Sequence, residues 1–385
     1  MKKLFTFESF EKLIQIIAIC ITAIAMLSIL ESCGSEYVNC KSLTENRNVL
    51  PLHALNIAGE KDLNIVFLPE GYTVDQMDDF VAEVNVAWGI LRQTKPYCHS
   101  LDRINVYYST AMASATDSLG SGHTVFALGT PKPLRASCEI SLDSIINVTK
   151  RLPFDADKTV LVIMVNVGGN IQLGFTILSK PEPKMLLPET VVIRSLFYRY
   201  PAAFTHEMGH AIGLLADEYY YNGDNFVFNE KECEEMLSWQ KYGAYLNVST
   251  SSNESEVFWS QFIIDEDFAE EHIGIYEGGQ TFPMGVYRST FNSVMRYYFE
   301  CDFYNAVDRY LIYHRIEKIH SGRDISYEEW KQTDLMYPQA PINWHDLTGG
   351  ITRSSENVSD RDCICSGSDV VIIHDYIFYS EIFSQ

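Results

Sequence analysis

Positive charge is scarce in this chain of 385 residues, because 29 lysines and arginines face 51 aspartates and glutamates and leave a formal net charge of −22. Recognition of nucleic acid requires clustered Lys and Arg side chains, so this composition argues against a nucleic-acid partner. It also disfavours peripheral binding to anionic membranes. Glycine and proline, at 22 and 13 residues, are too few for a collagen-like or low-complexity chain, and we find no internal repeat. The 46% of hydrophobic residues is ample for the buried core of a globular protein.

The N-terminus carries a targeting segment, residues 1–32, which is excluded from the fold. Two lysines precede the apolar run LIQIIAICITAIAMLSIL at residues 13–30, and LESCGSE follows it. This pattern is typical of a lipoprotein signal peptide in which Cys33 is lipidated, although Glu31 stands where a small residue is usual. An uncleaved membrane anchor and ordinary secretion are the alternatives. We expect a lipoprotein of the bacterial cell envelope, in the outer membrane or at the surface, attached to the membrane only through its lipid.

Strand-like and helix-like segments alternate over residues 61–330, which predicts an α/β (α+β) domain. Buried strands are expected in NIVFLPEG, INVYY, TVLVIMV and TVVIR, because these runs are rich in β-branched and aromatic residues. A helix is expected in DQMDDFVAEVNVAWGILRQ, whose apolar residues recur at helical spacing ahead of Pro96. Residues 33–60 are interpreted as a polar lead-in and residues 331–385 as a C-terminal extension of unknown role.

The most informative stretch is THEMGHAIGLLADEY, which begins at Thr205. Four residues along a helix return to the same face, so His206 and His210 can present both imidazoles to one Zn²⁺ ion. Glu207 points to one side and can act as a general base on a zinc-activated water. Two incidental histidines on a helix are the alternative, but the apolar residues around the motif favour a buried active-site helix.

The motif leaves the third protein ligand open. Zincins with the pattern HExxHxxGxxH place this ligand three residues after the glycine, where this chain has Ala216, which cannot bind a metal. Asp217 can reach the ion only if the chain turns after Gly213, because a continued helix would carry it about 10 Å along the axis from His210. Glu218 is a second candidate. A layout with a second helix would draw the ligand from NEKECEEM, which offers Glu230, Glu232, Glu234 and Glu235.

SVMRY, at residues 293–297, is similar to the Met-turn of metzincins, in which a methionine lies beneath the metal. This interpretation assigns that place to Met295, and it makes Tyr297 a candidate catalytic residue that leans towards the zinc or the oxyanion. A methionine in an ordinary core turn is the alternative. Together with the upstream motif, the Met-turn favours Asp217 over a ligand from a second helix.

Most of residues 60–320 resembles the IgA-peptidase family of zinc metallopeptidases. NIVFLPEGYT, RINVYYST, VLVIMVNVGGN, HEMGHAIGLLADEY and GVYRSTFNSVMR are similar to successive blocks of that family. The resemblance implies a zincin-like (metzincin-like) domain with a twisted mixed sheet and an active-site helix, acting as a secreted or surface zinc endopeptidase. It implies a set of site residues: His206, His210 and Asp217 as ligands, Glu207 as the base and Met295 in the Met-turn. RSTFNSVM lacks the proline-containing stretch common in the family, and the N-terminal domain of many relatives is missing.

The predicted function is therefore zinc-dependent hydrolysis of peptide bonds in a protein or peptide substrate by a monomer. A surface protein on the same scaffold that binds a host protein or glycan without cleaving it is the alternative, although it would not need Glu207. An amidase acting on a non-peptide amide is a third hypothesis.

Two further features bear on the substrate. Gly168 and Gly169 end a strand that could be the exposed edge on which a peptide adds as a further strand. Arg288 and Arg296 could steady a carboxylate near the zinc, but we interpret both as structural residues that pair with carboxylates in an acidic protein.

Overall fold

The computed structural model describes residues 49–130, 139–167, 173–179, 187–196, 202–221, 227–298 and 301–339, with Ile342 and Leu347. The predicted signal peptide, Cys33 and most of the predicted C-terminal extension lie outside the described residues. Within these ranges no helix has the length and apolar character needed to cross a membrane. The structure therefore bears on the predicted catalytic domain.

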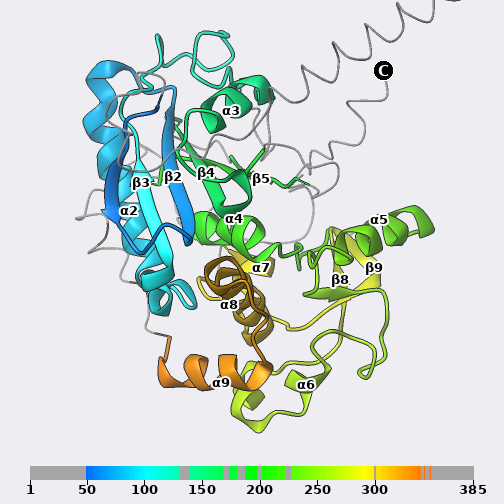
Figure 1. Cartoon of the computed structure of the whole chain (residues 1–385). Helices are drawn as coiled ribbons and strands as arrows, with labels where there is room; N and C mark the ends of the chain where they lie inside the picture. The colour runs from blue at the N-terminus through cyan, green and yellow to red at the C-terminus, as the bar shows by residue number, and fades with distance from the viewer. Residues whose placement is uncertain are drawn as a thin grey trace, which may run out of the picture. The chain divides into compact units, whose positions relative to one another are not determined.

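A mixed sheet of six strands is formed by the N-terminal part of the described chain (Figure 1). Its strands, in spatial order, are β1 (His53–Asn56), β3 (Ile104–Tyr108), β2 (Leu63–Glu70), β4 (Thr159–Val165), β6 (Glu189–Arg194) and β5 (Gly174–Ile177). The four inner strands are parallel, whereas β1 and β5 are antiparallel to their neighbours. The prediction of an α/β (α+β) domain is confirmed, and the four expected strands are the four inner ones.

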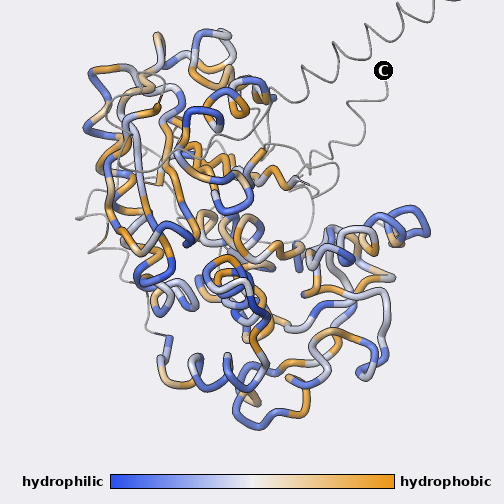
Figure 2. Tube along the Cα trace, in the orientation of Figure 1, coloured by the Kyte–Doolittle hydropathy of each residue, from blue (hydrophilic) through white to orange (hydrophobic). Residues whose placement is uncertain are grey.

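Both faces of this sheet are covered. All residues of β2 and β4 are buried. Phe67 packs on one face in a core that includes α2 (Met77–Leu91) and α4 (Ala202–Gly213), whereas Leu68 packs on the other with α3 (Leu142–Thr149). Figure 2 shows the resulting hydrophobic stretches along the strands. Parallel strands that are buried on both faces need no polar alternation, which is why apolar runs identified them in the sequence.

Helix α4 lies in the interior, where it contacts the β5–β6 end of the sheet and helix α8 (Ala306–Ser321) (Figure 1). Two glycines allow this close packing. A Cβ atom on Gly213 would lie 2.7 Å from Ile312 Cγ1, and one on Gly209 would lie 2.7 Å from Met295 Sδ. The helix of the HExxH motif is therefore fixed tightly against its neighbours.

A smaller antiparallel sheet follows α4 in the chain (Figure 1). It contains, in spatial order, β7 (Val248–Ser249), β9 (Phe282–Arg288) and β8 (Tyr276–Gly279). Its neighbours in the chain are α5 (Glu230–Gln240), α6 (Ser260–Ile263) and α7 (Val294–Tyr297). The sequence analysis did not predict this sheet, because its strands are short and contain glycines at positive φ, Gly278 and Gly285.

Two predicted domain limits do not separate packed units. The predicted lead-in 33–60 contains β1, which pairs with β3 in the main sheet. The predicted limit after residue 330 falls inside α9 (Tyr327–Met336), whose Trp330 is buried in the main core and whose Asp334 pairs with Arg309 at 2.9 Å. The described residues on both sides of each limit belong to the same domain.

Candidate metal centre

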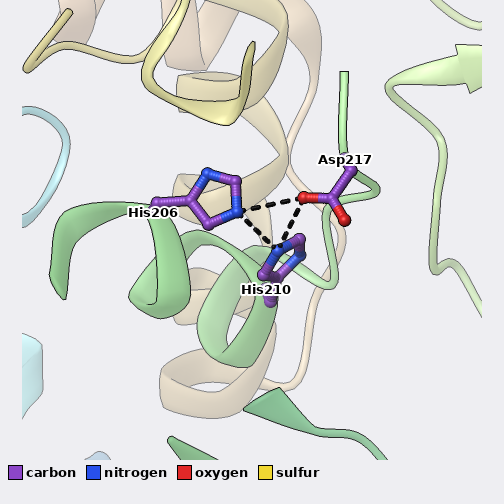
Figure 3. Close-up of side chains that lie close together, drawn as sticks. All are labelled: His206, His210 and Asp217. Atoms are coloured by element: carbon purple, nitrogen blue, oxygen red, sulfur yellow. Dashed lines mark hydrogen bonds and ion pairs between the residues drawn. The ribbon is translucent and has the colours of Figure 1, made fainter. Parts of the chain in front are cut away.

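Helix α4 presents the two histidines of the motif to one point. The imidazole centroids of His206 and His210 lie 4.7 Å apart. Their Nδ1 atoms face backbone carbonyls, that of Val294 at 2.9 Å from His206 and that of Leu215 at 2.7 Å from His210. A carbonyl can only accept a hydrogen bond, so each Nδ1 carries the proton and donates it. The lone pair of each neutral imidazole is then on Nε2, and Figure 3 shows both Nε2 atoms pointing to the same place.

The chain turns after α4 as expected, but Leu214 makes the turn. Leu214 has a φ of 51°, in the left-handed region, whereas Gly213 is the last helical residue and has no positive φ. The turn returns the chain towards the helix, so that the Leu215 carbonyl reaches His210. Gly213 therefore serves the packing of α8, and the turn that was expected after it is made by Leu214.

This turn brings Asp217 to the two histidines (Figure 3). Asp217 Oδ1 lies 3.0 Å from His206 Nε2 and 3.2 Å from His210 Nε2, and the two Nε2 atoms are 3.0 Å apart. All three residues are buried, none with more than 3% of its surface exposed. In the part of the chain that the structure describes, no other group of three His, Cys, Asp or Glu side chains could share one metal ion. The structure thus brings together the three residues that the sequence analysis favoured as ligands.

The donor atoms fit one divalent transition-metal ion. Their separations of 3.0–3.2 Å are close to the ~3.3 Å between two ligand atoms that each lie ~2.0 Å from a tetrahedral zinc. Ca²⁺ and Mg²⁺ prefer oxygen ligands, so two imidazoles argue against both. Zn²⁺ suits two imidazoles and a carboxylate, and so does iron(II).

In the metal-free protein, the same geometry favours a proton on His210. Burial by itself lowers the pKa of His210, but the neighbouring Asp217 carboxylate outweighs burial and raises this pKa to about 9. Burial by itself raises the pKa of Asp217, whereas His210 and His206 hold it well below its usual range. Metal binding must therefore displace a proton from His210.

The segment that carries Asp217 is held by distant parts of the chain. Ala216 N donates to Asn247 Oδ1 at 2.7 Å, and Asn247 Nδ2 donates to Ala216 O at 3.0 Å. The backbone N–H of Gln280 donates to the Asp217 carbonyl at 2.9 Å. Asn247 therefore positions the segment of Asp217 without touching the cluster of His206, His210 and Asp217. The sequence analysis missed it, because no local pattern links Asn247 to a residue 30 positions earlier.

Glu207 lies beside the cluster and is oriented by the edge strand β5. Thr176 Oγ1 donates to Glu207 Oε2 at 2.7 Å. Gly174, on the same strand, leaves room for the carboxylate, because an added Cβ would lie 3.2 Å from Glu207 Oε1. The strand beside the site is thus β5. The prediction that β4 is the edge strand is wrong, since β2 and β6 flank it, and Gly168 and Gly169 lie outside the described residues.

The other carboxylates considered as ligands are placed elsewhere. Glu218 is buried and accepts hydrogen bonds from Ser293, Ser289 and Asn305. Burial raises the pKa of Glu218, and the hydrogen bond from Ser293 opposes that rise. Four glutamates lie on α5 and are absent from the described metal-type cluster: Glu230, Glu232, Glu234 and Glu235. The compact layout is the one that the structure contains.

Met295 lies against α4, where its Sδ fills the space beside Gly209. Its carbonyl accepts a hydrogen bond from Glu218 N at 3.0 Å, which ties the predicted Met-turn to the segment of Asp217. Tyr297 is engaged differently from its predicted role, because its hydroxyl accepts a hydrogen bond from Arg296 Nη2 at 2.8 Å. The next residue, Tyr298, has its ring 5.3 Å from that of His206. A catalytic role for Tyr297 stays a prediction, and the tyrosine whose ring lies near His206 is Tyr298, the residue directly after α7.

The chain matches no protein-family model, and no curated protein matches it either. The resemblance to the IgA-peptidase family therefore rests on the motifs in this sequence.

Proposed function

We propose that this protein is a zinc-dependent peptidase that hydrolyses peptide bonds in protein substrates. The observation that carries the proposal is the convergence of His206 Nε2, His210 Nε2 and Asp217 Oδ1 within 3.2 Å of one another, with the Glu207 carboxylate beside them. Zinc hydrolases combine such a three-ligand set with a carboxylate base. An iron(II) site would use the same ligands but gives no role to Glu207.

Bound zinc would polarise the carbonyl of the scissile bond and lower the pKa of a water molecule. Glu207 accepts the proton of the attacking water on Oε1, because Oε2 is occupied by the Thr176 hydroxyl. It then passes this proton to the leaving amine as the C–N bond breaks. Thr176 keeps the carboxylate in place during both transfers. The carbonyls of Val294 and Leu215 keep the two imidazoles oriented for the ion.

The finer predictions of the sequence analysis belong to this proposal. A zincin-like arrangement is supported by the ligand helix beneath the sheet, the antiparallel edge strand β5 next to Glu207, and Met295 packed against α4. An edge strand beside the catalytic base suits a peptide that binds in extended form. The signal peptide predicts an envelope lipoprotein that is anchored through Cys33. An endopeptidase at that location would cleave proteins outside the cell, which agrees with the proposal.

The test is metal content and proteolysis of the leaderless protein and its Glu207→Gln variant. We expect about one zinc per chain in both proteins, by elemental analysis. Hydrolysis of labelled casein should fall by about 10²- to 10⁴-fold in the variant, because the base is lost while the ligands stay. Glu234→Gln is the matched control, since Glu234 is exposed on α5, and it should change neither quantity.

Unchanged proteolysis in Glu207→Gln would refute the mechanism. A zinc-loaded wild-type protein that cuts no protein or peptide would refute the proposal and favour the binding protein or the amidase. Iron in place of zinc in the protein as purified would refute the choice of metal.

A further inference from the structure

Two buried arginines, one before the Met-turn and one within it, form no ion pair with a carboxylate that the structure describes. Arg288 and Arg296 have 2% and 4% of their surface exposed. Neither forms an ion pair with any residue that the structure describes, although the chain has a net charge of −22. Other arginines of low exposure do so, as Arg309 does with Glu271 and Asp334, at 2.7 and 2.9 Å. The expected ion pairs of Arg288 and Arg296 are thus not found among the described residues, and the carboxylate that acts on Arg288 there is Glu218, through its charge.

Arg288 is used by the backbone around it. Its Nη1 donates to the carbonyls of Glu277 and Gly278, each at 2.6 Å, and its Nε donates to Thr290 O at 3.0 Å. These bonds fix the end of β8 and take up most of the guanidinium. Burial lowers the pKa of Arg288 and the nearby charge of Arg296 lowers it further, whereas the Glu218 carboxylate opposes this shift in part. Arg288 is thus a structural residue that adds positive charge to the region.

The guanidinium of Arg296 has hydrogen-bond donors that no described residue accepts. Its Nη1 donates to the Phe291 carbonyl and its Nη2 to the Tyr297 hydroxyl at 2.8 Å, whereas its buried Nε has no partner in the described part of the chain. Aromatic rings surround the guanidinium instead, with centroids at 4.3 Å for Phe291, 4.4 Å for Tyr297 and 5.7 Å for Tyr220. Nε–H and one N–H of Nη2 form the side of the guanidinium fork that binds a carboxylate through two hydrogen bonds, and the Tyr297 hydroxyl uses only one of the two Nη2 hydrogens.

The position of Arg296 links it to the metal centre through two chain segments. It lies between Met295, which packs against the ligand helix, and Tyr298, whose ring is 5.3 Å from His206. The ring of Tyr220 lies 5.7 Å from the Arg296 guanidinium and 5.5 Å from that of Arg288, and Tyr220 follows the ligand Asp217 by three residues. The two positive charges thus both lie near the ring of Tyr220, in the segment that follows Asp217.

We propose that Arg296 is the anion subsite of the metal centre and binds a carboxylate of the peptide substrate, with Arg288 adding its charge. This inference rests on the proposed function and narrows its substrates to peptides with an acidic side chain or a free C-terminal carboxylate near the scissile bond. A buried cation without a counter-charge is unfavourable, and a substrate carboxylate would supply that charge. Phe291, whose side chain covers the guanidinium, is 55% exposed, so a change of its rotamer would open Arg296 to the substrate.

The test compares peptides that differ only in the proposed anion. Fluorogenic peptides carry Glu or the isosteric Gln on either side of the cleaved bond, and a second set carries a free or an amidated C-terminus. In one of the two sets, we expect the peptide with the carboxylate to have a kcat/KM about 10- to 100-fold higher than its neutral counterpart. The neutral peptide is slower because it lacks the charge-assisted hydrogen bond to Arg296. The first set identifies a side chain as the anion and the second set a C-terminus.

Arg296→Gln should remove this preference by slowing the acidic peptide while leaving the neutral one nearly unchanged. Arg296→Lys, which keeps the charge but not the fork, should retain part of the preference and guards against a variant that misfolds. Arg323→Gln removes an exposed arginine that pairs with Glu329, and it should behave as wild type. Zinc content reports on the fold of each protein.

Binding gives a readout that does not depend on turnover. In the Glu207→Gln background, fluorescence anisotropy should show tighter binding of the acidic peptide than of its neutral form, and Arg296→Gln should abolish the difference. Equal cleavage and equal binding of acidic and neutral peptides would overturn the anion subsite and leave the peptidase standing. Failure of the zinc protein to cleave any peptide would overturn the peptidase, and the binding comparison would still decide whether Arg296 holds a carboxylate.

Discussion

The proposed metal centre has a helical part and a loop part, and the two parts are built differently. His206 and His210 come from adjacent turns of α4, so the period of the helix alone places them together. Asp217 comes from a segment without regular structure, held by Asn247, the Gln280 amide and the left-handed Leu214. The first part is encoded within five residues of sequence, and the second depends on contacts made across the fold.

This difference indicates which part of the site can lose its structure while the other part keeps it. The helix keeps its form as long as its core packing holds. The Asp217 segment keeps its place only while β8, α7 and the residues before β7 stay docked. The loop part should therefore respond to substitutions far from the ion, and the helical part should not.

The largest effect is expected from removing one ligand of either part. His210→Ala and Asp217→Ala should both lose zinc, because two remaining ligands hold it weakly. They should differ in the stability of the metal-free protein. His210→Ala leaves a buried carboxylate short of its counter-charge, at a cost of about 3–5 kcal/mol, whereas Asp217→Ala leaves two histidines that can be neutral.

Elemental analysis and urea unfolding in EDTA measure the two quantities. His314→Ala is the control, because this half-buried histidine pairs with Asp324 away from the cluster, and it should keep its zinc. Full zinc occupancy in either ligand variant would refute the assignment of that ligand.

The next effect concerns pH, because Asp217 controls the protonation of His210. The pKa of His210 is about 9 in the fold and ~6.5 in the unfolded chain. A raised pKa stabilises the metal-free protein fully below pH ~6.5, and this contribution disappears as the pH rises through 9. The metal-free protein should therefore lose about 3 kcal/mol of stability over that range.

Melting temperatures from pH 6 to 9.5, in EDTA and with zinc, measure this loss. Zinc takes the place of the proton, so the zinc-loaded protein should not show it. Asp217→Asn should flatten the curve in EDTA, because the charge that raises the pKa is gone. Parallel curves with and without zinc would contradict the proposed exchange of a proton for the ion.

Asn247→Ala should disturb the position of the Asp217 segment without changing any of the three proposed ligands. The variant leaves the backbone N–H and carbonyl of Ala216 without their partners, so stability should fall by about 1–3 kcal/mol. Zinc affinity should fall by about 10- to 100-fold, because Asp217 is no longer held in position. Competition with a zinc chelator measures the affinity. Asn253→Ala, in an exposed loop, is the control, and equal affinity in both variants would show that Asn247 does not position the ligand.

The same contrast explains what the sequence could predict. The two histidines and the four inner strands follow from helical spacing and from apolar runs, which are local signals. Asp217 was favoured only on the condition of a turn, and the turn falls at Leu214, a residue type with no preference for positive φ. Thr176 and Asn247 gave no signal, since each acts on a residue about 30 positions away.

Local signals also misled where tertiary contacts decide. Arg288 and Arg296 sit in an acidic chain, yet their described contacts are to backbone carbonyls, a tyrosine hydroxyl and aromatic rings and include no ion pair. Residues 331–339 look like the start of an extension, yet Asp334 pairs with Arg309 and Lys95 in the main domain. Charge composition gives the average surroundings of a residue and not its partner.

The Gly209→Ala variant tests whether the positions of His206 and His210 depend on the helix alone or also on its packing. Helix propensity alone predicts a gain of about 1 kcal/mol, because glycine is a poor helix former. The added Cβ would lie 2.7 Å from Met295 Sδ and 2.9 Å from Tyr304 Cε1. Overpacking costs about 1–3 kcal/mol, so we expect a small net loss of stability.

Met295 should move before Tyr304, because methionine is flexible whereas the Tyr304 hydroxyl is bound to Tyr97 and to the Thr205 carbonyl. A shift of Met295 would also move the neighbouring Val294 carbonyl, which orients His206, so zinc affinity should fall slightly. Urea unfolding and chelator competition measure both effects. The double variant Gly209→Ala/Met295→Ala should cost less than the two single variants together, because removing Sδ frees the space that the Cβ needs. A more stable Gly209→Ala variant with unchanged zinc affinity would mean that the helix alone governs its two ligands.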